Sequence, residues 1–115
     1  MHMRRPAEFK QVYANGRSAS DSTMKTVVAP NGLEHVRLGL SVGRRYGNAL
    51  RRNRFKRLVR EAFRLNRDAL PVGFDIVVIP RTKVEPTFEQ VGTSLVRLAN
   101  EAAHRCSSRS KGGTR

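Results

Sequence analysis

Residues 44–67 read RRYGNALRRNRFKRLVREAFRLNR, and this stretch decides how the chain is organised. Asn48 is expected to cap a helix after the turn at Gly47, and the helix runs to about Asn66. Its apolar residues recur at the spacing of three and four that places side chains on one helix face. The stripe that we expect to be buried consists of Phe55, Leu58, Val59, Ala62 and Phe63.

The remaining surface of this helix is strongly cationic. Residues 44–67 hold ten of the 23 lysines and arginines but a single acid, Glu61. The helix carries cation on cation at i, i+4 through Arg52, Lys56, Arg60 and Arg64, which destabilises an isolated helix, whereas an ordinary solvated face mixes the signs. Charge this dense repels itself unless a polyanion neutralises it, and a nucleic-acid backbone does so with release of counterions. The weaker interpretation of the basic helix is that its cationic face is only solvated and binds no partner. Individual arginines can nevertheless serve only to pack their aliphatic stems against the protein.

The composition of the chain also indicates a protein that binds nucleic acid. A chain of 115 residues predicts one domain with a modest core. The net charge of +14 and the isoelectric point of about 11.6 are typical of nucleic-acid binders. The chain has no apolar run long enough for a membrane span and no signal-peptide core at its N-terminus. The single cysteine, Cys106, allows no internal disulfide and fits a reducing cytosol, so we expect a cytoplasmic protein.

The other elements follow from hydrophobic periodicity and from turn signals at proline and glycine. In chain order we expect a helix over 6–15, a turn or short edge strand over 17–23, strands over 25–29 and 36–42, the basic helix, a central strand over 74–79, and a helix from Thr87 to about His104. The last helix should bury Phe88, Val91, Leu95, Leu98 and Ala102. This order predicts an α+β fold, a sandwich of helices and one sheet. The single domain spans 1–104, and the Gly/Ser-rich basic tail 105–115 is expected to be disordered.

The strand over 36–42 alternates strictly. Its apolar face carries Val36, Leu38, Leu40 and Val42, and its other face carries Arg37, Gly39 and Ser41. That second face is small and polar beside one cation, so it leaves room for something flat or flexible to lie on the sheet.

Catalytic machinery is not indicated. The nine acids are spread thinly, whereas a nuclease built from side chains needs clustered carboxylates to hold Mg²⁺. We find no phosphate-binding glycine loop, zinc cluster or Ser/His/Asp set, and expect no catalytic residue and no protein-held metal. Phe9 and Tyr13 have the chemistry to stack on nucleobases. Aromatic residues on the inner face of a short helix are more often core, however, and the residues alone favour core.

Residues 40–60, LSVGRRYGNALRRNRFKRLVR, resemble the signature of the bacterial ribonuclease P protein subunit. The hallmark is the box Arg52-Asn53-Arg54, followed by Lys56-Arg57 and Arg60. Phe9 and Val12-Tyr13 fit the family's first helix, and residues 74–79 fit its last strand. The resemblance covers all of the chain except the tail.

The resemblance implies one mixed sheet of about four strands in the order helix, three strands, helix, strand, helix. It also implies a left-handed βαβ crossover around the basic helix, opposite to the usual rule. The chemistry that removes the 5′ leader of precursor tRNA would belong to a catalytic RNA subunit with bound Mg²⁺. The protein would be an accessory subunit of this endonuclease, without a cofactor of its own and monomeric in a 1:1 ribonucleoprotein.

The same resemblance divides the site residues into two sets. Contacts to the RNA subunit would be made by Arg44, Arg45, Arg51, Arg52, Asn53, Arg54 and Arg57. The single-stranded leader would lie in a cleft between the first helix and the sheet, against Phe9, Tyr13, Arg37, Ser41, Lys56 and Arg60. This interpretation moves Phe9 and Tyr13 from core to cleft lining. Relatives often place an aromatic residue on the strand near 24–29, and MKTVVA has none.

Two other classes of protein remain as alternatives. A ribosomal or general RNA-binding protein would show the same charge, and only the 40–60 signature argues against it. A helix that binds anionic membranes would need a broad exposed apolar face. Here the apolar stripe of the basic helix is needed to cover the sheet.

Overall fold

The computed structural model describes residues 3, 5–81 and 84–113, with the side chains of 107–113 outside the description. Within these residues the chain forms three α-helices and one four-stranded sheet, with single 3₁₀ turns at Arg44–Tyr46 and Arg67–Ala69. The predicted α+β class is therefore confirmed. The helices and strands are α1 (Pro6–Asn15), β1 (Arg17–Ser20), β2 (Met24–Pro30), β3 (Arg37–Leu40), α2 (Ala49–Leu65), β4 (Phe74–Pro80) and α3 (Phe88–Gly113).

The sheet is mixed, as expected, and its strand order is β1-β2-β4-β3. β2 pairs antiparallel with β1 and β4, and β3 pairs parallel with β4. Of the two alternatives for 17–23, a turn or a short edge strand, the structure has the edge strand β1, and the central strand predicted over 74–79 is also present. Because α2 connects two parallel neighbours, β3–α2–β4 is a crossover unit. Its left hand stays an expectation from the resemblance.

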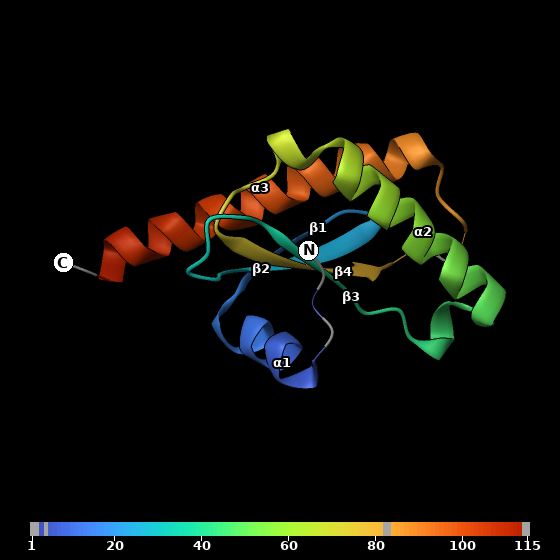
Figure 1. The fold of residues 1–115 in the computed structure, drawn as a ribbon, viewed down its shortest axis with the longest axis horizontal. Helices are drawn as coiled ribbons and strands as arrows, with labels where there is room; N and C mark the ends of the chain where they lie inside the picture. Colours follow the sequence, from blue (N-terminus) through green and yellow to red (C-terminus); the bar gives the residue numbers. More distant parts are fainter. Residues whose placement is uncertain (1–2, 4, 82–83, 114–115) are drawn as a thin grey trace.

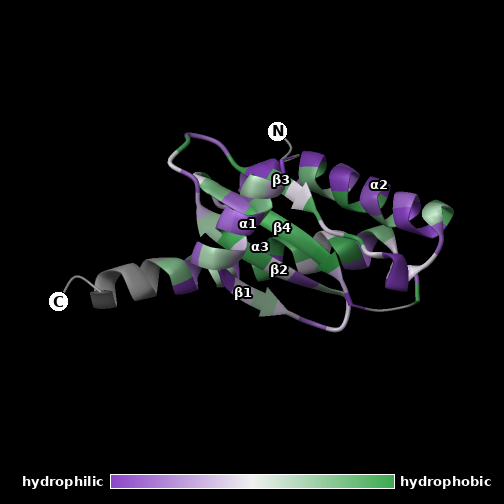
Figure 2. Cartoon of the chain, turned by 90° about the horizontal axis from the view of Figure 1, so that it is seen from below, coloured by the Kyte–Doolittle hydropathy of each residue, from purple (hydrophilic) through white to green (hydrophobic). Residues whose placement is uncertain are grey.

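Helices cover both faces of the sheet. Figure 1 shows α2 and α3 on one face and α1 on the other. Between the sheet and α2, Phe55, Val59 and Ala62 are fully buried and Phe63 nearly so, while Leu58 packs at the margin of the core. Figure 2 shows the apolar β4 in the middle of the molecule and hydrophilic residues along the outer side of α2. The stripe and the polar face predicted for the basic helix are thus both confirmed.

The first turn of α2 begins as predicted. The side chain of Asn48 accepts a hydrogen bond from the backbone N–H of Arg51 at 3.0 Å, which satisfies one of the free donors at a helix start. The helix ends one residue before the predicted Asn66. The start of α2 is therefore defined by a side-chain cap.

α1 lies very close to the sheet. Val12 is buried against Val27, Ala29 and Val77, in a second apolar cluster that is separate from the one under α2 and α3. At Gly16, where the chain leaves α1, an added Cβ would lie 2.5 Å from the carbonyl oxygen of Val12 and 2.9 Å from that of Val28. Both neighbours are backbone atoms, so only glycine permits this approach.

The predicted end of the last helix is wrong. α3 does begin after Thr87, whose hydroxyl accepts from the N–H of Gln90 at 3.1 Å while the Gln90 side chain accepts from the Thr87 N–H at 2.9 Å. It then runs to Gly113 instead of ending near His104. Cys106 is buried and its thiol donates to the carbonyl of Val28 at 3.3 Å, a contact between helix and sheet that local composition does not reveal. Disorder in the tail stays a prediction, and residues 114–115 lie outside the described residues.

β3 is shorter than the strand predicted over 36–42. Val36 and Leu38 are buried, and Leu40 and Val42 pack at the margin of the core, so the predicted inward face is right. Beyond the strand, the N–H of Ser41 still donates to the carbonyl of Val78 at 3.0 Å. The segment therefore follows β4 past the end of the regular pairing.

Candidate nucleic-acid interface

The outer face of α2 is an exposed cationic surface. Arg54, Arg57, Arg60 and Arg64 are all exposed, on the side of the helix that does not contact the sheet. Glu61 receives two hydrogen bonds from Arg64, at 2.7 and 3.0 Å, and this contact lowers the pKa of Glu61. Among the described residues, no acid lies within ion-pair distance of Arg57 or Arg60. Arg54 lies 3.9 Å from Glu85, so two of these four arginines have an acid partner and two have none within the described part of the chain.

The residues assigned to the RNA subunit by resemblance differ in their exposure to solvent. Arg51 and Arg52 are half-buried, and the Arg51 guanidinium lies 4.9 Å from the centre of the Tyr46 ring. Tyr46 is itself buried and packs against Phe55 at 5.3 Å between ring centres. Sequence reasoning missed Tyr46, which anchors the turn before α2. The remaining members of the set are exposed to solvent: Arg44, Arg45, Asn53, Arg54 and Arg57.

Arg37, assigned to the leader by resemblance, lies in an ion-pair network. Its guanidinium donates to both carboxylate oxygens of Asp75, at 2.7 and 2.6 Å, and to Glu8 at 2.8 Å. The hydrogen bonds to Asp75 are the main reason that the pKa of Arg37 is raised, with Glu8 adding to them. These contacts join α1, β3 and β4, so the charge of Arg37 is already balanced inside the protein.

The room expected over Gly39 is filled by the chain itself. A Cβ at this position would lie 2.9 Å from the tip of the Phe9 ring and 3.3 Å from the sulfur of Met3. Phe9 is half-buried and packs on the apolar cluster under α1. The expectation of an open surface is therefore wrong at Gly39, because a side chain of α1 occupies the space that a missing Cβ provides.

On the same face of the sheet as Gly39, the next row of residues across the strands is accessible. Ser20 pairs with Lys25, Lys25 pairs with Ile79, and Ser41 lies beside this pair through its hydrogen bond to Val78. Lys25 and Ser20 are exposed, and Ile79 and Ser41 are half-buried. We call these four residues, Ser20, Lys25, Ile79 and Ser41, the sheet strip. Sequence reasoning missed Lys25 and Ile79, since only the strand register brings them beside Ser41.

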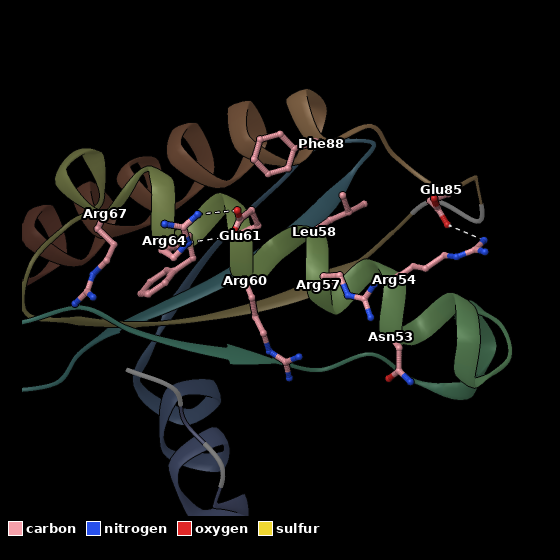
Figure 3. A pocket seen from close by; sticks show the side chains of 11 residues that line it. Asn53, Arg54, Arg57, Leu58, Arg60, Glu61, Arg64, Arg67, Glu85 and Phe88 are labelled. Carbon is pink, nitrogen blue, oxygen red and sulfur yellow. Dashed lines mark hydrogen bonds and ion pairs between the residues drawn. The ribbon is translucent and has the colours of Figure 1, made fainter.

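The other leader-side candidates that stay accessible come from α1 and α2. Tyr13, one turn after Phe9 on α1, is 46% exposed. From α2, Lys56 is half-buried and Arg60 is exposed. Figure 3 shows Arg60 extending from α2 to the level of β3. Of the six predicted leader-side residues, Tyr13, Ser41, Lys56 and Arg60 thus remain accessible, whereas Phe9 and Arg37 are engaged within the fold.

In the described part of the chain, no group of three or more His, Cys, Asp or Glu side chains is placed to hold a metal ion. None of the helices described is both long and apolar enough to cross a membrane.

Comparison with known proteins gives a consistent match over nearly the whole chain. The family model described as Ribonuclease P matches residues 1–103. The ribonuclease P protein component of Thermotoga maritima is 44% identical over 90 residues, which are 78% of this chain and 77% of that protein. That of Chloroflexus aggregans is 39% identical over 102 residues, which are 87% of this chain and 76% of that protein.

Solved structures agree with the fold described above. The ribonuclease P protein from Thermotoga maritima superposes with a TM-score of 0.77 at 37% identity, over 84% of this chain and 93% of that one. The Staphylococcus aureus protein gives a TM-score of 0.77 at 31% identity, over 88% and 94% of the two chains. The chain belongs to the ribonuclease P protein family, the protein components of the ribonuclease that processes the 5′ end of tRNA.

Proposed function

We propose that the chain holds a catalytic RNA subunit with the outer face of α2 and holds the 5′ leader of precursor tRNA along the sheet strip. The observation that carries this proposal is the unbalanced charge of α2. Exposed arginines cover its outer face, and the only acids that contact them among the described residues are Glu61 and Glu85, the latter 3.9 Å from Arg54. A phosphate backbone supplies the missing negative charge and releases counterions when it does so.

The proposed contact with the 5′ leader depends on a different combination of chemical groups. Single-stranded RNA is bound by cations that follow the backbone and by aromatic faces on which bases stack. Tyr13 offers an exposed aromatic ring, Lys25 is an exposed cation within the strip, and Arg60 is an exposed cation on α2. Arg37 acts indirectly here, because its ion pairs hold α1 and therefore Tyr13 against the sheet.

Chemistry is assigned to the RNA subunit and its Mg²⁺. The acids of the described residues are largely engaged by arginines: Asp75 and Glu8 by Arg37, Asp21 by Arg97, Glu61 by Arg64, and Glu101 by Arg105. A carboxylate that neutralises a guanidinium is a poor ligand for a second cation. The protein then contributes binding and positioning, as one copy per RNA subunit, in the cytoplasm.

The test is the salt dependence of binding to the RNA subunit. With about 6–10 phosphate contacts, affinity should fall on the order of 10³–10⁵-fold between about 50 and 200 mM salt. A slope equivalent to one or two phosphates would contradict the proposed role of α2.

Two sets of variants separate the two RNA contacts. Arg52→Ala with Arg54→Ala should weaken assembly with the RNA subunit, and saturating protein should restore leader-dependent cleavage. Tyr13→Ala should leave assembly unchanged and weaken binding of precursor tRNA that carries a leader. Mature tRNA, which lacks the leader, is the control and should bind the Tyr13 variant normally. Equal loss for mature tRNA would argue against a leader contact at Tyr13.

A further inference from the structure

A groove of about 960 Å³ lies between α2 and the start of α3. Figure 3 shows Phe88 above it on α3, Leu58 beneath, and the arginines of α2 along its open side. Neither the sequence signature nor the resemblance assigns a role to Phe88 or Leu58. The volume falls within the range of about 300–1,000 Å³ in which ligand sites occur.

Phe88 departs from its predicted place. Its position on α3 puts it in register with the buried Val91 and Leu95, yet it is 41% exposed. Leu58, expected in the stripe of α2, is also only partly buried and lines the same groove together with Phe63. A single exposed apolar side chain needs no explanation. Here, however, α2 and α3 each leave an apolar side chain partly exposed, Leu58 and Phe88, and both line the same groove.

The charge around these apolar groups is positive. Five arginines and two glutamates line the groove. Glu61 holds Arg64 through a two-point contact, which fixes the guanidinium at the groove, and Arg67 lies 5.7 Å from the centre of the Phe63 ring. Arg57 has no acid within ion-pair distance among the described residues. A ligand that fits must therefore be anionic and present a flat apolar face.

We propose that this groove receives one unpaired nucleotide of the RNA subunit, with its base against Phe88 and Leu58 and its phosphate on Arg57. This inference rests on the proposed function, and it extends the RNA contact around α2 to α3. Duplex RNA presents phosphates but keeps its base faces stacked, so it would leave Phe88 without a partner. An acidic peptide would satisfy the arginines but not the aromatic ring.

Substitutions at Phe88 test the stacking contact. Phe88→Ala should weaken binding of the RNA subunit by about 5- to 140-fold, which corresponds to the loss of one stacked base. The salt slope should not change, because no phosphate contact is removed. Phe88→Tyr should restore affinity, since it keeps the aromatic face. Arg57→Ala should instead lower both the affinity and the salt slope, the slope by about one.

Leu65→Ala is the matched control. Leu65 is 56% exposed and lies on α2 outside the groove, so its truncation should leave RNA affinity unchanged. Equal losses for Phe88→Ala and Leu65→Ala would overturn the proposal, because they would reflect a general effect of removing surface apolar area.

A fluorescence measurement reads out stacking directly. The chain contains no tryptophan, so Phe88→Trp introduces a single indole at the groove. We expect its emission to be quenched when the RNA subunit binds, and the emission of Leu65→Trp to remain. RNA binding with a steep salt slope but without quenching would overturn the groove proposal while leaving the proposed function intact. A competition experiment adds poly-glutamate or single-stranded RNA to the complex of the Phe88→Trp variant with the RNA subunit. If poly-glutamate reverses the quenching as readily as single-stranded RNA does, the groove recognises negative charge alone and the proposal is overturned.

Discussion

Arg37 links three elements of the fold through ion pairs. Its guanidinium bridges Asp75 on β4 and Glu8 on α1, and the Asp75 side chain is only 8% exposed. Removing one partner of such a pair leaves the other charge uncompensated in a poorly solvated place. The family resemblance assigns Arg37 to the leader, whereas its contacts favour a role in holding α1.

Asp75→Asn should therefore destabilise the protein. We expect a loss of about 2–3 kcal/mol in the free energy of unfolding, below the 3–5 kcal/mol of a fully buried pair because Arg37 is 24% exposed. Urea denaturation measures this loss. Glu61→Gln is the control, because its partner Arg64 is exposed and the pair lies on one helix, so its stability should not change measurably. Equal stabilities of Asp75→Asn and the wild type would refute the role of this pair.

Asp21 predicts a dependence of stability on pH. Burial alone would raise its pKa and is the largest single effect, but hydrogen bonds from Ser94, Met24 and Thr23 and the charge of Arg97 together lower it below the ordinary 3.8. Because the folded pKa is below the unfolded one, the stabilisation by this carboxylate is complete above the unfolded pKa. It is lost as the pH falls through the folded pKa.

The Asp21→Asn variant should accordingly be less stable than the wild type near neutral pH, and the difference should shrink below about pH 4. Thermal or urea unfolding across this pH range measures the difference. A gap that stays constant down to the acid limit would show that the charge of Asp21 is not what stabilises the turn.

At the scale of elements, α2 could be predicted almost completely from the sequence. Its cap, its buried stripe and its cationic face all follow from spacing along one helix, and the structure has them as expected. What sequence could not give depends on contacts between distant segments. α3 continues past the predicted end through Cys106, whose thiol donates to the carbonyl of Val28 on β2, and Lys25 and Ile79 meet Ser41 only through strand register.

The filled space over Gly39 has the same origin. A small residue on a strand predicts free space above the sheet. Only the docking of α1 shows that Phe9 fills the space above Gly39. The exposure of Phe88 could not be predicted either, since the periodicity of α3 gives its face but not where α2 stops covering it.

Gly16 tests how tightly α1 must dock. Gly16→Ala should cost about 1–3 kcal/mol of stability, because the added methyl meets two backbone carbonyls that cannot move aside. Gly43→Ala is a suitable control, since nothing lies within 4 Å of its Cβ and its φ of −80° suits alanine. We expect Gly43→Ala to be neutral or slightly stabilising in the same unfolding experiment. Similar stabilities for the two variants would mean that α1 can shift freely on the sheet.

At the scale of the whole molecule, the two proposed RNA contacts meet at one edge of the sheet. β3 is the edge strand, and both α2 and the sheet strip adjoin it. In the layered arrangement of Figure 1, α1 and α2 lie on opposite faces of the sheet, so the two proposed contacts would lie on opposite faces and share only this edge. Under the proposed function, the net charge of +14 would serve both contacts, and the chain would bridge catalytic RNA and substrate.

The most direct test of this account is a cleavage assay with protein freed of RNA. Precursor tRNA is incubated with the protein and millimolar Mg²⁺, and the RNA subunit is then added. We predict no 5′-end maturation before the addition, and specific maturation after it that exceeds the rate with the RNA subunit alone. Cleavage by the nuclease-stripped protein that disappears when one carboxylate is mutated would contradict the account, because it would place the chemistry in the protein itself.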